Sequence, residues 1–172
     1  MKTVTYEQFL EFKPCWLEDG RAEKLAKIGA RKQDWTAVDV LKLRSVSMED
    51  RLWAVLREEF LPATILHEFA CRCAERALKK AKVTDERSWN AIKVKRAWLK
   101  GEATDEELAA ARAAAAAAWA AGAAGAAAWA AWAAGAAWAV AAWVAAWAAR
   151  DTAAAAERKL QVADLLALCE EE

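Results

Sequence analysis

The residue types best suited to chemistry are few, and three of them lie close together in the sequence. His67 and Cys71 are four residues apart, so they would share one face of a helix, and both side-chain types bind zinc. Cys73 would point to another face, and the sequence offers no second ligand pair. The alternative is that both cysteines are small core residues and that His67 contacts a neighbouring helix. We favour this alternative and expect neither a metal nor a cofactor.

The sequence contains few residues in arrangements that could support catalysis. A relay with a serine or cysteine nucleophile would have to use His67, the single histidine. Glu58 and Glu59 are adjacent and would not share a helix face. Thr64 stands where a di-iron Glu-x-x-His motif needs a glutamate, and there is no glycine-rich phosphate loop. We therefore expect a non-enzymatic protein without catalytic residues.

Basic residues do cluster, on two segments that we expect to form antiparallel neighbouring helices. The first segment carries Lys79, Lys80 and Lys82. On the second segment, the candidate binding residues are Lys93, Arg96 and Lys100, together with Trp89 and Trp98 as stacking surfaces. Such a site would suit a phosphate-bearing ligand or an acidic protein partner. The alternative is a solvated charged face, with both tryptophans in the core.

The overall composition narrows the function further. The 172 residues suit one domain, and 25 basic residues balance 25 acidic ones. A net charge of zero gives no general attraction to nucleic acid or to an anionic membrane, so we expect neither as a partner. The chain opens without a charged-then-apolar signal, and its four cysteines form no Cys-x-x-Cys pair. We expect a cytoplasmic location with reduced thiols.

Helix start signals recur along the chain. The pairs are Thr5 with Gln8, Thr36 with Asp39, Ser47 with Asp50, and Thr104 with Glu107, and Thr84 and Pro62 suit two further starts. The third pair would open a helix with an apolar stripe formed by Leu52, Val55, Leu56 and Phe60. No stretch alternates convincingly with a period of two, so the sequence predicts an all-α multi-helix bundle.

The composition changes near Arg112, because no charged residue occurs from Ala113 to Ala149. We therefore divide the chain into a charged multi-helix body, residues 1–108, and an Ala/Trp-rich helical region, residues 109–172, packed on it as one structural domain. One helix from Asp105 to Leu168 would be about 95 Å long, whereas a compact chain of this size has a radius of gyration near 16 Å. We expect a break at Gly122–Gly125.

The uncharged stretch is long enough to cross a bilayer. It contains no Leu, Ile or Phe, however, and its tryptophans run through its middle, whereas membrane tryptophans prefer the interfaces. We therefore favour alanine helices in a soluble bundle. Trp129, Trp132, Trp143 and Trp147 would form one helical stripe. The stripe must meet the protein's own body, a second copy or a partner, so Trp143 and Trp147 join the candidate binding residues.

Three segments carry a resemblance to a known family: Phe69–Leu78, Asp85–Ile92 and Trp98–Leu108, followed by the Ala/Trp run. The sharpest element is the Gly-Glu-x-Thr-x-Glu-Glu-Leu entry into an alanine-rich helical tail. With these features the chain resembles the fifth-immunity-protein-like immunity proteins of bacteria, prophages and tailed phages, over about Leu52 to Leu166. The resemblance implies an α-helical protein, in the cytoplasm of a bacterial host cell, that neutralises a toxin or defence component by binding. It implies no particular binding residues.

Three functions follow as hypotheses. The first is an immunity or counter-defence protein that binds and blocks a protein partner. The second is a helical sponge that sequesters a small nucleotide-like signal in a pocket lined by tryptophan and basic residues. The third is a structural helical assembly protein, which would be a homo-oligomer.

Overall fold

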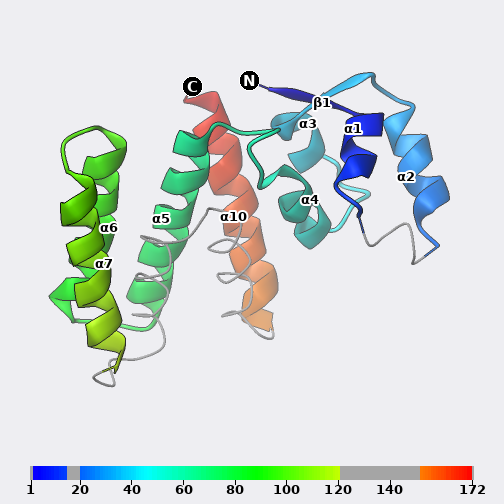
Figure 1. Ribbon diagram of the computed structural model, residues 1–172. Coiled ribbons are helices and arrows are strands. Elements are labelled where there is room, and N and C mark those ends of the chain that lie inside the picture. The colour runs from blue at the N-terminus through cyan, green and yellow to red at the C-terminus, as the bar shows by residue number, and fades with distance from the viewer. Residues whose placement is uncertain (1, 15–19, 121–151, 172) are drawn as a thin grey trace.

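The computed structural model describes residues 2–14, 20–120 and 152–171, and helices dominate these residues (Figure 1). The helices are α1 (Tyr6–Glu11), α2 (Ala22–Gly29), α3 (Ala37–Leu41), α4 (Met48–Val55), α5 (Ala63–Lys80), α6 (Glu86–Leu99), α7 (Asp105–Ala120) and α10 (Thr152–Glu170). The strands are β1 (Thr3–Thr5) and β2 (Asp34–Thr36). The prediction of an all-α multi-helix fold is confirmed.

The two strands form a small antiparallel pair in which Thr3 lies opposite Thr36. Each strand runs directly into a helix, because Thr5 caps α1 and Thr36 caps α3 with complete capping boxes. No sequence pattern predicted this strand pair, since three residues are too few for a period of two to be recognised.

Most helix starts lie where the sequence predicts them. Ser47 caps α4, and Thr104 and Glu107 form reciprocal hydrogen bonds at the start of α7. For α6 the prediction was wrong by one residue, because the side chain of Asp85, not Thr84, accepts the backbone N–H of Arg87.

The predicted apolar stripe on α4 needs a second correction. The helix ends at Val55, and Leu56 already has non-helical backbone angles. Phe60 therefore reaches the core from the turn that follows, where it is fully buried.

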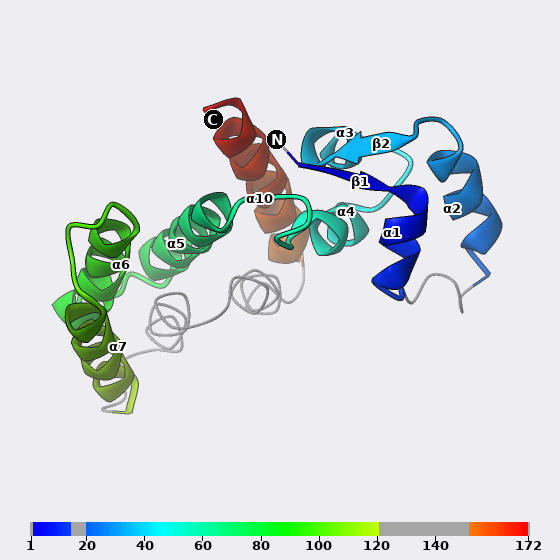
Figure 2. The ribbon, with the colours of Figure 1, turned by 45° about the horizontal axis from the view of Figure 1, so that its top comes forward.

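The long helices lie side by side. Helices α5, α6 and α7 follow one another in antiparallel order, and α10 lies along the other side of α5 (Figures 1 and 2). Helix α10 also contacts α3 and α4, so it joins the small N-terminal helices to the long ones. None of the described helices has the length and hydropathy needed to cross a bilayer.

The largest hydrophobic cluster unites the N-terminal helices with α5 and α10. Its fully buried members include Leu41, Phe60, Leu66, Phe69 and Leu165. Two smaller clusters pack α5 against α6 and α6 against α7. The C-terminal segment is thus part of the main core. The expected break at Gly122–Gly125 and the tryptophan stripe lie outside the described residues.

Candidate binding site on the hairpin of α6 and α7

The basic segments are antiparallel neighbours, as predicted, but this arrangement separates their lysines. The C-terminal end of α5, with Lys79 and Lys80, lies next to the start of α6, whereas Lys100 follows the last residue of α6. A helix of this length is roughly 20 Å long. Lys79 and Lys100 therefore lie at opposite ends of α6.

Arg96 is held by two carboxylates of α5. Its Nε and Nη2 donate to the two carboxylate oxygens of Glu68, both at 3.0 Å, and Nη2 also donates to Glu75 at 3.0 Å. The hydrogen bond from Arg96 lowers the pKa of Glu75. This network joins α6 to α5 and occupies the Nε–Nη2 edge of the guanidinium group.

Trp89 also connects these two helices. Its ring packs against the cluster formed by Ala70, Cys71, Leu78 and Ile92, and its Nε1 donates to the carbonyl of Val83 at 2.9 Å. The indole thus has both its apolar surface and its polar atom engaged inside the protein.

Trp98 is the centre of a cluster that the sequence did not reveal. The Lys95 ammonium lies 3.9 Å from the centroid of the Trp98 ring, and the His67 ring meets it edge-on at 6.0 Å. Trp98 Nε1 donates to Asp105 at the start of α7. The signal for Lys95 was its spacing of three residues from Trp98, which places both side chains on one helix face.

His67 and the two cysteines of α5 are buried or half-buried. Burial and the nearby Lys95 lower the pKa of His67, whose Nδ1 has no hydrogen-bond partner among the described residues. Burial raises the pKa of Cys71 and of Cys73 to about 12, so both are thiols at neutral pH. In the described ranges, no three His, Cys, Asp or Glu side chains group in a way that could hold a metal ion.

Lys93 and Lys100 are exposed, and Lys93 lies at the edge of an open groove of about 530 Å³ between α6 and α7. The groove residues are Asn90, Lys93, Val94, Ala97, Glu102, Ala103, Glu107, Ala110, Ala111 and Ala114. Half of these residues are alanines, whose small side chains leave the space open. Glu102, Ala103 and Glu107 belong to Gly101–Leu108, the sharpest element of the resemblance expected from the sequence.

The turn between α6 and α7 shapes one end of this groove. Gly101 has a φ of +73°, a left-handed conformation that glycine adopts without strain. The Glu107 carboxylate accepts the N–H of Thr104 and so fixes the entry into α7. Of the residues predicted for binding, Lys93 alone lines the groove; Trp143 and Trp147 lie outside the described residues.

No known protein family matches the sequence, and no curated protein or solved structure is significantly similar to it. The fold and the groove define a multi-helix protein with a surface groove in which half of the lining residues are alanines. The resemblance to immunity proteins stays a prediction.

Proposed function

We propose that this protein is a non-enzymatic immunity or counter-defence protein of the bacterial cytoplasm, which binds a toxin or a defence component and thereby neutralises it. The observation that carries the proposal is the groove between α6 and α7. The sharpest element of the resemblance to immunity proteins, Gly101–Leu108, contributes three of the groove residues.

The groove has the properties of a surface that receives an apolar helix or strand of a partner. Alanines and Val94 form most of its lining, and a partner's side chains can cover them at little entropic cost. Lys93 lies on one side and Glu102 on the turn, so the rim carries both signs of charge and can select the orientation of a partner.

The test compares two arginine variants on α7. Ala110→Arg combined with Ala114→Arg fills the groove, and Ala116→Arg is the matched control, because Ala116 is exposed and lies outside the groove. Each tagged protein is recovered from phage-infected bacteria and examined by native mass spectrometry.

The expected result is one protein that the parent and Ala116→Arg retain and the groove variant loses. That protein should also slow bacterial growth when expressed alone, and co-expression of the parent should restore growth. A bound protein that the parent and both variants retain equally would contradict the groove as the binding site. A partner that does not affect growth would contradict neutralisation.

A nucleotide-like ligand is the second candidate, and one observation favours it. Lys93 and Asn90 bring a cation and an amide to the same groove, and both could bind a phosphate. A bound small molecule of nucleotide-like mass in the same spectra, lost in Lys93→Gln, would support this sponge function. A symmetric oligomer without other components would support the structural assembly hypothesis.

A further inference from the structure

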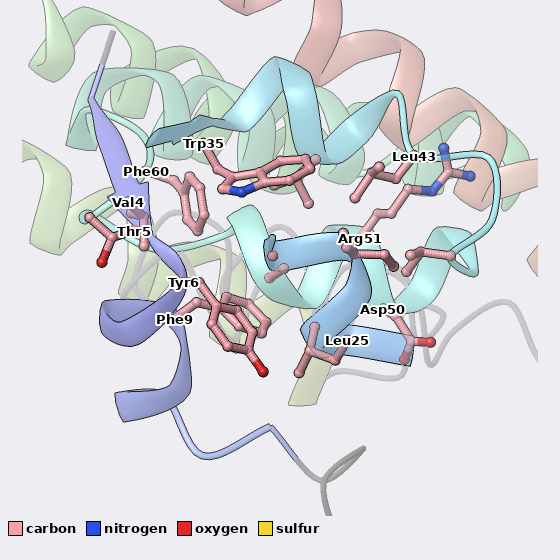
Figure 3. Close-up of a pocket in the computed structure, with 15 residues that line it drawn as sticks. Val4, Thr5, Tyr6, Phe9, Leu25, Trp35, Leu43, Asp50, Arg51 and Phe60 are labelled. Carbon is pink, nitrogen blue, oxygen red and sulfur yellow. The ribbon is translucent and has the colours of Figure 1, made fainter. Parts of the chain in front are cut away.

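The N-terminal helices line a partly open cavity that no predicted site includes. It has a volume of about 60 Å³ and lies among α1, α2, α3, α4 and the strand pair. Aromatic rings from different elements, Tyr6, Phe9, Trp35 and Phe60, come together around it (Figure 3). It has room for about five water-sized groups, but its walls are almost entirely apolar, so water would find few partners there.

A second, more open hollow of about 210 Å³ adjoins this cavity. The two spaces have four wall residues in common: Leu25, Ile28, Val46 and Asp50. The remaining wall of the outer hollow is polar and is formed by Arg21, Lys24 and Ser47. The pair of spaces is therefore apolar inside and polar at its mouth.

The charges at the mouth do not cancel. Arg21 donates to the Asp50 carboxylate at 3.2 Å and so neutralises it. The Lys24 ammonium donates to the carbonyl of Ser45 and forms no ion pair in the described part of the chain. The Ser47 hydroxyl accepts the N–H of Asp50, which leaves its own proton to donate. The mouth thus offers one cation and one hydroxyl to an anion.

We propose that these spaces form a binding site for a short-chain aliphatic carboxylate. The alkyl chain occupies the apolar cavity, and the carboxylate lies at the mouth, where Lys24 and Ser47 donate to it. An apolar space with a few polar groups at one end is the usual form of a small-molecule site. The site is far along the chain from the groove on α6 and α7, and this proposal is independent of the proposed function.

The charge at the mouth is tested with hexanoate and the uncharged hexan-1-ol. Binding is followed in two-dimensional NMR spectra through the indole resonance of Trp35, whose ring lines the cavity. Lys24→Gln should weaken hexanoate binding about fivefold, as expected for a partly exposed ion pair, and should leave hexan-1-ol unchanged. The matched control is Lys27→Gln, because Lys27 is on the same helix but pairs with Glu23 and lines neither space.

The cavity itself is tested by filling it. Ala54→Leu adds side-chain volume from α4, and Val46→Phe adds it from the loop between α3 and α4. Because the two variants change different elements, the test does not depend on a single variant that folds. Each folded variant should lose the binding of both compounds. Three results would overturn the proposal: no saturable shift with hexanoate, equal effects of Lys24→Gln on both compounds, or undiminished binding in a folded cavity-filling variant.

Discussion

The Lys95 ammonium lies 3.9 Å from the centroid of the Trp98 ring, although Lys95 is only 4% exposed. Its contact with the ring is a cation–π interaction, which compensates part of the cost of burying the charge. Arg112 of α7 is close enough to add a repulsive interaction, and burial together with Arg112 lowers the pKa of Lys95. The charge of the buried Lys95 therefore destabilises the folded protein at the contact between α6 and α7.

We expect Lys95→Met to stabilise the protein at pH 7 by about 1 kcal/mol, because a methionine fits over an aromatic ring without a buried charge. The gain should shrink as the pH rises towards about 10.5. Between the lowered pKa of Lys95 in the folded protein and its ordinary value, the unfolded chain binds more protons at this side chain than the folded protein does, so rising pH favours the folded parent. Urea denaturation of both proteins at pH 7 and pH 10 measures the difference. A gain that is the same at both values would contradict the assignment.

Substitutions of Arg96 and of Lys93, both on α6, should differ in their effect on the free energy of unfolding. Arg96→Met removes the hydrogen bonds to Glu68 and Glu75 and should cost about 1–2 kcal/mol at neutral pH. The exposed Lys93 lines the groove, and Lys93→Met should change stability by less than about 0.5 kcal/mol.

Arg96→Met also allows a test of the pH dependence of stability. Arg96 lowers the pKa of Glu75, so this part of the stability is present above the ordinary carboxyl pKa and is lost as the pH falls below it. The difference between the parent and Arg96→Met should therefore narrow at pH 3 in denaturation experiments. A constant difference would show that Arg96 acts through packing rather than through its ion pairs.

Gly29 allows close contact between α1 and α2. A Cβ atom at this position would lie 2.4 Å from a carbon of the Tyr6 ring, well inside van der Waals contact. Gly29→Ala should cost about 1–3 kcal/mol, because the ring has to move within a packed site. Tyr6→Leu should relieve most of this cost, and a double-mutant cycle from thermal melts measures the coupling. Additive effects of the two changes would contradict the contact.

Capping residues a few positions apart in the sequence were enough to predict most helix starts. They did not predict the contacts between helices. Thr5, Thr36 and Thr104 bond to residues three positions away, so their roles can be read from spacing. Arg96 was expected to be available for a ligand because Glu68 and Glu75 lie 28 and 21 residues away, and only the docking of α6 on α5 brings them together. The apolar cavity requires four helices in place, and no sequence pattern marks such a space.

The C-terminal helix offers the clearest test of the core. Leu165 is fully buried in the main cluster, whereas Leu160, on the same helix, is 50% exposed. Helix α10 is also held by the ion pair from Arg76 of α5 to Glu157 at 2.8 Å. Leu165→Ala should cost about 2–5 kcal/mol through the lost contacts and the remaining cavity. Leu160→Ala, the matched control, should cost less than about 1 kcal/mol. Chemical denaturation of both variants measures the difference, and equal costs would mean that α10 does not complete the core that unites the N-terminal helices with α5.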